Sequence, residues 1–217
     1  MSSPARIARH AERARQHRQD LYQVLDAGHQ IGTLSTVMDG QPWVVPMLYA
    51  RVGDRILLHG STGAGALRHV AAGAPAALCV THLDGWVYAH TLFDSSANYR
   101  SAVVHSELAV LTGKDAASAL TDLSDRMLPG RSTEVPDHTR KQLAATQALA
   151  MNIVDGRWTV KVRQGGPGEP ATSEQVPPGL WTGVLPIRSV YGDPVPAPRV
   201  PDGLPPSPSI QRLMSTH

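Results

Sequence analysis

The sequence predicts a mainly β fold, a small antiparallel barrel with appended helices, and three observations lead to this prediction. Glycine and proline are abundant, with 19 and 18 of 217 residues, whereas aromatic residues make up only 5%. Such a composition disfavours a helical bundle and favours short strands and turns. Asp-Gly, the strongest short signal for a hairpin turn, occurs at residues 39–40, 84–85 and 155–156. The chain therefore divides into about seven strands and three helices, joined mostly by tight turns.

The first predicted element is an N-terminal helix within residues 1–28, which Gly28 ends. It is rich in arginine and poor in apolar residues. An arginine-rich helix can bind nucleic acid, but no aromatic residue is interleaved with the arginines, and Glu12 and Asp20 offset part of the charge. We favour a solvated helix that faces a partner. The arginines are Arg6, Arg9, Arg13, Arg15 and Arg18.

Residues 31–59 are predicted to form a β-meander, because β-rich segments alternate with turn signals, and a short helix and a hairpin follow up to residue 93. Asp84-Gly85 is expected to form the two-residue turn of the clearest hairpin. The predicted strands are 31–37, 43–50, 55–59, 76–83 and 86–93, with one short helix at 66–72. The hairpin's expected core face contains Leu78, Val80, Val87, Ala89 and Phe93. Its more polar face, which could line a site or an interface, contains Cys79, Trp86, Tyr88 and His90.

The second half of the chain continues this pattern and then changes in composition. After residue 164 come a Gly/Pro linker, a β-like segment at 180–190 and a stretch in which seven of the fifteen residues 194–208 are proline. Such a stretch is predicted to be an extended tail. The preceding elements are a strand at 99–112, helices at 115–128 and 136–147, and a third Asp-Gly hairpin of strands 148–154 and 157–162. The predicted regions are an N-terminal helix (1–28), a barrel (29–190) and a Pro-rich tail (191–217).

Composition and motifs argue against several classes of protein. No apolar run approaches the roughly 20 residues of a membrane span, and a net charge of +2 is too small to imply a polyanionic partner. The single cysteine, Cys79, and an N-terminus without an apolar signal region favour a cytoplasmic protein. The usual zinc hydrolase and serine hydrolase motifs are absent.

A glycine-rich loop at residues 60–65 is a candidate phosphate site. Its glycine spacing fits a P-loop, but Ala66 and Leu67 stand where Lys and Ser/Thr are required, so nucleoside triphosphate hydrolysis is not expected. Backbone N–H groups, the hydroxyls of Ser61 and Thr62 and the charge of Arg68 can still bind an anion. A flexible hairpin loop explains the same residues equally well.

Ten histidines raise the question of a metal or haem site. With a two-residue turn at 84–85, His82 and His90 fall on opposite faces of the hairpin and cannot share one metal ion. A histidine taken singly is more often a surface or hydrogen-bonded residue than a ligand. No metal site follows from the spacing alone.

Five segments stand out in order along the chain: the strand with Pro46 and Tyr49, Ile56-Leu-Leu-His-Gly-Ser-Thr-Gly-Ala-Gly-Ala-Leu-Arg68, Cys79-Val-Thr-His-Leu-Asp-Gly85, Ser96-Ala-Asn-Tyr-Arg-Ser-Ala-Val-Val104 and Trp181-Thr-Gly-Val-Leu-Pro-Ile187. Together they resemble the pyridoxamine 5′-phosphate oxidase-like flavin-nucleotide-binding proteins, nearest the nitroimidazole-resistance-type branch. The resemblance implies a split, Greek-key-like antiparallel β-barrel. It also implies a homodimer that binds FMN in two equivalent clefts between the subunits.

The resemblance further implies which residues contact the cofactor. The loop from Gly60 to Arg68 matches the segment that approaches the FMN phosphate, and Arg100 matches a second phosphate-side position. Such arginines form charge-assisted hydrogen bonds with a phosphate. His59 matches a position from which it could bond a substrate, touch the phosphate or ligate haem. The implied cofactor contacts are Pro46, Met47, Leu48, Tyr49, His59, Ser61, Thr62, Gly65, Arg68, Asn98, Tyr99, Arg100, Ser101 and Trp181.

The function that the resemblance implies is an FMN-dependent oxidoreductase. It would pass reducing equivalents from NAD(P)H to a small organic acceptor, such as a nitroaromatic compound or a quinone. The flavin carries the redox chemistry, which fits the absence of a catalytic triad. A second hypothesis is a protein that binds or uses haem b, with His59, His69 or His90 as the axial ligand. Further alternatives are a deazaflavin (F420)-dependent reductase, a non-catalytic flavin-binding protein and a DNA-associated regulator.

Overall fold

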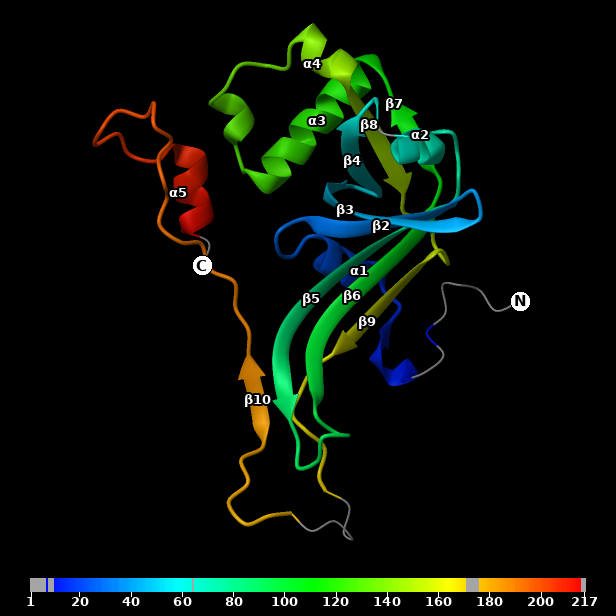
Figure 1. Ribbon diagram of the computed structural model, residues 1–217, viewed down its shortest axis with the longest axis vertical. Helices are drawn as coiled ribbons and strands as arrows, with labels where there is room; N and C mark the ends of the chain where they lie inside the picture. Colours follow the sequence, from blue (N-terminus) through cyan, green and yellow to red (C-terminus); the bar gives the residue numbers. More distant parts are fainter. Residues whose placement is uncertain (1–6, 8–9, 64, 171–175, 216–217) are drawn as a thin grey trace.

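The computed structural model describes residue 7 and residues 10–63, 65–170 and 176–215 of the chain (Figure 1). Its main element is one ten-stranded sheet, whose neighbouring strands are antiparallel. The strands are β1 (Ala14–Arg15), β2 (Ile31–Met38), β3 (Gln41–Val52), β4 (Arg55–Ser61), β5 (Ala76–Tyr88), β6 (Ser96–Ser106), β7 (Leu108–Leu111), β8 (Thr146–Asn152), β9 (Trp158–Arg163) and β10 (Gly183–Pro186).

The order β1-β9-β6-β5-β2-β3-β4-β8-β7, with β10 added to β5, leaves β1 and β7 as unjoined ends. The sheet therefore curls without closing, and the predicted antiparallel split barrel with appended helices is confirmed. No helix in the described ranges is long and apolar enough to cross a membrane. The helices are η1 (Ala11–Arg13), α1 (Arg18–Leu25), α2 (Gly65–Ala71), α3 (Gly113–Met127), η2 (Arg131–Thr133), α4 (Arg140–Ala145) and α5 (Pro208–Met214).

Helix α1 covers the main core of the barrel. Its residues Leu21, Val24 and Leu25 are buried among the side chains of the sheet. Among the described residues, the helix is shorter than the predicted N-terminal helix, and it packs on the sheet instead of projecting into solvent. Arg6 and Arg9 of the predicted helix lie outside the described residues. Each buried Leu or Val side chain contributes roughly 1.5–3 kcal/mol, which explains why the helix packs on the barrel. On its polar side, Arg18 forms ion pairs with Asp54 and Asp155.

Of the three Asp-Gly pairs that were predicted to form hairpin turns, only one does. Asp39 and Gly40 both have positive φ and join β2 to β3 directly, as a type I′ turn requires. Asp84-Gly85 lies inside the continuous strand β5, at an irregularity in its pairing with β6, so the prediction of a hairpin there is wrong. A Cβ atom on Gly85 would lie 2.9 Å from the carbonyl oxygen of Leu185. Glycine is therefore needed at this position because β10 approaches closely.

The chain actually reverses at residues 89–95, between β5 and β6. Phe93, predicted in the core, is 93% exposed at this turn, whereas Val87 is buried as predicted. The Asp155-Gly156 hairpin is also wrong, because β8 pairs with β4 and β7 whereas β9 pairs with β6 and β1. The predicted strand 99–112 is two strands, β6 and β7, which pair with different neighbours.

Helix α3 forms a second, smaller core on the other side of β3, β4 and β8. Its residues Ala119 and Leu123 pack against Ala50, Leu57 and Ala150. The following helix α4 begins with a capping box in which Thr139 and Gln142 exchange hydrogen bonds. It is shorter than the predicted helix at 136–147, because residues 146 and 147 already pair with β4.

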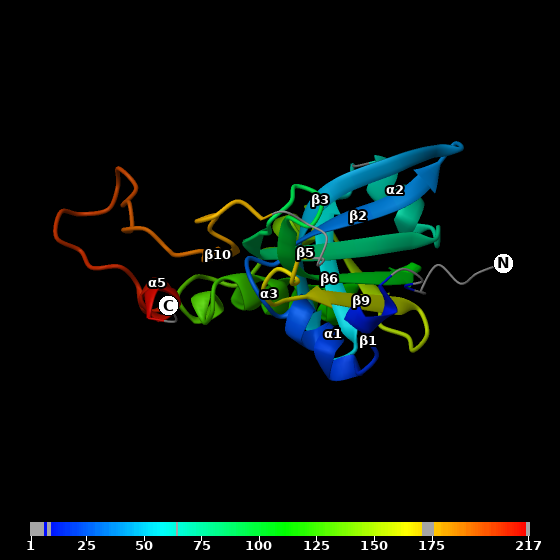
Figure 2. The same cartoon turned by 90° about the horizontal axis from the view of Figure 1, so that it is seen from below.

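The C-terminal region differs from the predicted extended tail in its last part. Figures 1 and 2 show the segment after β10 running outside the sheet and ending in α5, beside the α3 region. Pro208 stands in the first turn of α5, where proline is well tolerated. Ser209 is buried, and its N–H and hydroxyl donate to the carboxylate of Glu134 at 2.7 Å each. Arg212 donates to the carbonyl of Pro129, so α5 is anchored to the segment after α3.

Candidate functional site

The strand predicted to lie along the flavin ring, residues 46–49 of β3, presents two different faces. Pro46 and Leu48 are exposed on the outer face of the sheet. Met47 packs against the core, and Tyr49 is completely buried. The Tyr49 hydroxyl donates to the carbonyl of Leu25 at 2.6 Å, and burial raises the pKa of this phenol. Tyr49 is therefore a hydrogen-bonded core residue, whereas Pro46 and Leu48 are available to a ligand.

One edge of β3 is open beside these residues. Over residues 41–48 the strand pairs with β2, and its pairing with β4 begins only at Tyr49. Pro42 and Pro46 fit this edge, because proline has no N–H to donate and is tolerated at sheet edges. Backbone carbonyl groups on an open edge can accept hydrogen bonds from a polar ring.

The predicted phosphate loop begins where β4 ends. Gly63 N–H donates to the Ser61 hydroxyl at 3.2 Å, and Thr62 N–H donates to the carbonyl of Ala145 at 3.3 Å. Gly65 opens α2, on which the Arg68 side chain is exposed. A Cβ atom on Gly60 would lie only 2.1 Å from Cδ1 of Leu67, so this glycine serves the packing of α2 on β4. The loop therefore contains hydrogen-bond donors that could bind an anion, but packing against Leu67 already explains the glycine at position 60.

Arg100, the second predicted phosphate contact, is already paired. Its guanidinium donates to both carboxylate oxygens of Asp84 at 2.8 to 3.2 Å, which raises the pKa of Arg100. Arg100 lies opposite His82, and His82 bonds the Val24 carbonyl of α1 at 2.9 Å. Ser106 lies six positions beyond Arg100 along β6, which is roughly 20 Å at the rise of a strand. Since Ser106 pairs with Ala76, just after α2, one chain does not bring Arg100 to the loop.

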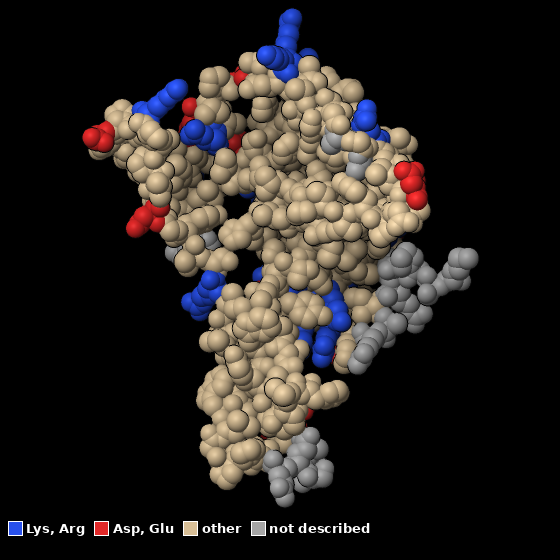
Figure 3. Space-filling model, viewed as in Figure 1, with Lys and Arg blue, Asp and Glu red and all other residues tan. Residues whose placement is uncertain are grey.

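The remaining predicted contacts on β6 divide between interior and surface. Asn98 is buried, donates to the Gly165 carbonyl at 3.0 Å and accepts from Arg163 at 2.9 Å. Tyr99 and Ser101 face outward, and their cross-strand neighbours on β9 are Arg163 and Lys161. Figure 3 shows basic side chains gathered near β9, whereas the surface over β5 and β10 is almost uncharged. This part of the outer face combines hydroxyl groups with positive charge.

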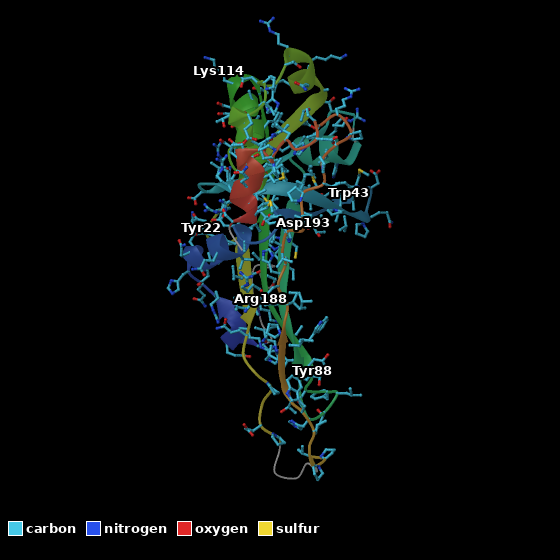
Figure 4. The ribbon with its side chains drawn as sticks, turned by 90° about the vertical axis from the view of Figure 1, so that its left-hand side faces the viewer. Tyr22, Trp43, Tyr88, Lys114, Arg188 and Asp193 are labelled. Atoms are coloured by element: carbon cyan, nitrogen blue, oxygen red, sulfur yellow. The ribbon has the colours of Figure 1, made fainter. Side chains whose placement is uncertain are left out.

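Trp181 lies at the other end of the molecule from α3. It precedes β10, is 63% exposed and contacts the Tyr88 ring edge-on, with centroids 5.8 Å apart. In Figure 4, Tyr88 lies at the lower end of the long strands, far from Lys114 at the start of α3. Nearby exposed apolar side chains are Trp86, Leu92, Phe93 and Leu185. Within one chain, Trp181 belongs to this apolar end and not to the phosphate loop.

The three candidate haem histidines have different surroundings. The His69 ring bonds the carbonyl of Val37 at 2.9 Å, and Nε2 of His90 lies 3.6 Å from the Asp94 carboxylate. His59, on β4, faces the α3 side of the sheet, and its Nδ1 is buried without a hydrogen-bond partner among the described residues. Burial lowers the pKa of His59, which favours the neutral imidazole that metals bind.

His59 lines a cavity of about 360 Å³ between β4 and the helices α3 and α4. This volume lies within the range of small-molecule sites. A second histidine, His138, lines the same cavity from the segment before α4. Sequence reasoning missed His138, because no spacing rule connects a residue after α3 with one on β4. The lining residues are Leu48, His59, Leu120, Leu123, Ser124, Met127, His138, Gln142, Leu143 and Thr146.

The cavity suits a flat apolar group with a metal at its centre. Leucine and methionine side chains make part of the wall apolar, while two imidazoles offer nitrogen ligands. No group of three or more His, Cys, Asp or Glu side chains that could hold a bare metal ion occurs in the described part of the chain. A porphyrin supplies four equatorial nitrogens itself, so its iron needs only axial ligands from a protein. The residues present therefore fit haem.

Comparisons with known proteins agree with this architecture. A FAD and haem binding protein from Mycobacterium smegmatis is 41% identical, with a TM-score of 0.88 over 93% of this chain and 97% of its own. The flavocytochrome Anf3 from Azotobacter vinelandii is 26% identical, with a TM-score of 0.86 over 98% and 97%. A putative 5-nitroimidazole antibiotic resistance protein from Bacteroides thetaiotaomicron is 14% identical, with a TM-score of 0.59 over 69% and 86%, and shows the fold alone.

No curated protein matches the sequence. The sequence profile of the family described as pyridoxamine 5′-phosphate oxidase matches residues 17–158, which confirms the resemblance predicted from the five segments. The profile match and the identity to the mycobacterial protein show that this chain belongs to the pyridoxamine 5′-phosphate oxidase family.

Proposed function

We propose that this protein is a redox protein that binds both a flavin and haem. The observation that carries the proposal is His59, whose buried Nδ1 lacks a partner among the described residues and which lines a cavity with leucine and methionine side chains. The two similar proteins described as a FAD and haem binding protein and as a flavocytochrome support it, since each covers more than nine-tenths of this chain. The haem alternative and the flavin hypothesis thus combine into one function.

For haem, the chain would supply His59 as an axial ligand and an apolar wall. Leu120 and Leu123 of α3 and Leu143 of α4 line the cavity around the imidazole. These side chains exclude water and lower the local dielectric, which tunes the potential of a bound iron. When bound, haem supplies one-electron chemistry. His69 and His90 are less suitable ligands, because their imidazoles already contact Val37 and Asp94.

For the flavin, we propose a site on the outer face of the sheet. Pro46 and Leu48 with the open edge of β3 would contact the ring, as the resemblance implied. Ser101, Tyr99 and Lys161 offer hydroxyl and ammonium donors to phosphate groups on the same face. The second phosphate of FAD matches this wider spread of donors, so we propose FAD where the sequence predicted FMN. Bound flavin supplies hydride and single-electron chemistry.

A homodimer with the cofactor at the subunit interface also stays part of the proposal. The outer face carries exposed apolar side chains that a second copy would cover, among them Ile31, Val44 and Leu83. A partner chain would also bring its own Arg68 loop or Trp181 to this face, which one chain cannot do. Light scattering of the purified protein tests this, since a monomeric mass would remove the shared cleft.

The identity of the electron donor and acceptor remains a prediction. A reduced nicotinamide as donor and a nitroaromatic compound or quinone as acceptor were inferred from the resemblance. Stopped-flow mixing of the flavin-loaded protein with NADH or NADPH, followed at the flavin absorbance, tests the donor. The deazaflavin alternative is tested by adding F420 to the purified protein without flavin and measuring whether it binds.

The central experiment is the absorption spectrum of the purified protein before and after addition of hemin and of FAD or FMN. We expect a Soret band and a two-band flavin spectrum, each saturating at one equivalent per chain. Chromatography of the flavin released by denaturation distinguishes FAD from FMN. His59→Ala should abolish saturable haem binding and leave flavin binding intact, whereas the matched variant His69→Ala should change neither. A wild-type protein without a saturable Soret band would remove haem from the proposed function.

A further inference from the structure

The cavity that contains His59 also contains a second imidazole, and this pair suggests a more specific role than haem binding alone. His59 projects from β4, whereas His138 belongs to the segment that enters α4. The two residues are 79 positions apart in the chain and come from different walls of one cavity. Two imidazoles that line one cavity from different elements are enough in number for the two axial positions of a haem iron.

The segment that carries His138 is held at both ends. On its C-terminal side, Thr139 accepts from Gln142 N–H at 3.3 Å, and Gln142 accepts from Thr139 N–H at 2.8 Å. On its N-terminal side, Ser132 donates from its backbone to Asp125 at 2.8 Å, and Glu134 accepts from Ser209. These contacts keep the short segment between η2 and α4 beside the cavity, although the His138 side chain itself is exposed.

Other possible ligands in the cavity are weaker candidates. Met127 lines it, and a thioether can ligate haem iron, but Met127 packs against the smaller core cluster of α3. Ser124, Gln142 and Thr146 offer oxygen donors that prefer harder cations than haem iron. Imidazole is the ligand that suits iron, and His59 and His138 are the only imidazoles among the residues that line this cavity.

We propose that His59 and His138 are the two axial ligands of one haem iron in this cavity. The inference rests on the proposed function and adds to it the coordination number of the iron. A six-coordinate iron with two protein ligands has no open position for oxygen or substrate. The haem of this protein would then only transfer electrons, and the substrates would react at the flavin.

The test is reconstitution of the purified apoprotein with hemin, read by absorption and by electron paramagnetic resonance. We expect the wild type to give a low-spin ferric signal. His138→Ala should retain haem but convert it to a high-spin form, and added imidazole should restore the low-spin signal. His69→Ala, at a residue outside the cavity lining, is the matched control that should keep the wild-type spectrum. Met127→Leu tests the thioether as a competing ligand and should also stay low-spin. Circular dichroism of each apoprotein checks that the fold is retained.

The possible outcomes separate this inference from the proposed function. A wild type that fails to bind hemin contradicts the haem part of the proposed function. A wild type that binds hemin in a high-spin form, or a His138→Ala variant that remains low-spin, overturns the second axial ligand while His59 keeps its role. If Met127→Leu loses the low-spin signal and His138→Ala keeps it, the second axial ligand would be the thioether of Met127 instead.

Discussion

Tyr49 and His59 are two polar rings that the resemblance assigned to the same cofactor cleft, and the structure gives them opposite surroundings. Tyr49 faces the main core, where its hydroxyl donates to the Leu25 carbonyl at 2.6 Å. His59 faces the cavity between α3 and α4, where its buried Nδ1 has no partner among the described residues. A buried polar atom without a partner costs roughly 1–3 kcal/mol, so its presence needs an explanation.

Hydrogen-bonding partners distinguish the structural polar groups of this fold from His59. His82 and Asn98 resemble Tyr49, because each is hydrogen-bonded to a backbone carbonyl of a neighbouring segment. Such bonds attach α1 or the segment after β9 to the sheet. His59 makes no comparable attachment through its Nδ1 among the described residues, which supports the proposed role in ligand binding. The predictions below test this distinction, from the largest expected effect to the smallest.

The largest effect is expected at Tyr49. Tyr49→Ala should lower the free energy of unfolding by about 3–5 kcal/mol, because it removes a fully buried ring and leaves a cavity. Tyr49→Phe keeps the ring but leaves the Leu25 carbonyl without its donor, so a loss of about 1–3 kcal/mol is expected. Urea unfolding of the apoprotein measures both.

Flavin binding provides the contrast for Tyr49. If Tyr49 is purely structural, Tyr49→Phe should leave flavin affinity unchanged once the protein is folded. A variant that keeps its stability but loses flavin affinity would place Tyr49 in the cleft after all.

At His59 we expect a substitution to change the free energy of unfolding in the opposite direction. His59→Leu removes an unpartnered buried nitrogen and adds apolar contact, so the apoprotein should gain about 1 kcal/mol of stability. For a chain of this size that corresponds to roughly 2–4 °C in Tm. The same variant should lose haem binding. Destabilisation comparable to Tyr49→Phe would mean that His59 has a structural partner, and the comparison between the two rings would then fail.

These two residues also show what the sequence could and could not predict. The alternation of exposed and buried residues along β3 places Met47 and Tyr49 together on one face, so the core role of Tyr49 was within reach of pattern reasoning. Asp84-Gly85 was misleading because glycine permits a turn and a close backbone approach equally well. His138 and His59 line one cavity only through the packing of α3 and α4 on the sheet, and no local sequence signal predicts that they share it.

The C-terminal helix α5 is a second element that the sequence did not predict, because its stability depends on distant contacts. Proline content predicted an extended tail, and residues 187–197 between β10 and α5 contain no helix or strand. Helix α5 has only seven residues and would be marginal alone. Its stability depends on Ser209 and Arg212 reaching the segment after α3, which are contacts between residues more than 70 positions apart. Local composition cannot reveal them.

A smaller effect is expected at the ion pair of Asp84 and Arg100. Both side chains are about one-third exposed, so Asp84→Ala should cost only about 0.2–1 kcal/mol. The informative measurement is flavin affinity in Asp84→Ala and Arg100→Ala. If Arg100 is structural, the two variants should bind flavin alike. A loss of affinity confined to Arg100→Ala would show that the guanidinium leaves Asp84 to contact a phosphate, as the resemblance implied.

The smallest effect on global stability is expected at Glu134, which joins α5 to the wall that carries His138. Hydrogen bonds from Ser209, and then Arg131, lower the pKa of Glu134 from 4.5 to about 2. The stabilisation that this carboxylate gives is therefore complete above about pH 4.5 and is lost as the pH falls towards 2. Global unfolding should change little, because α5 lies outside both hydrophobic core clusters.

Hydrogen exchange of a peptide that spans residues 208–214 measures this local effect. We expect Glu134→Gln to raise exchange in α5 at pH 6, and the difference from wild type to shrink as the pH falls from 4.5 towards 2. Glu107→Gln, an exposed carboxylate elsewhere, is the matched control. Since Glu134 is four residues from His138, the haem-loaded Glu134→Gln variant should also show a larger high-spin fraction. Unchanged exchange in α5 would mean that this contact does not hold the cavity wall in place.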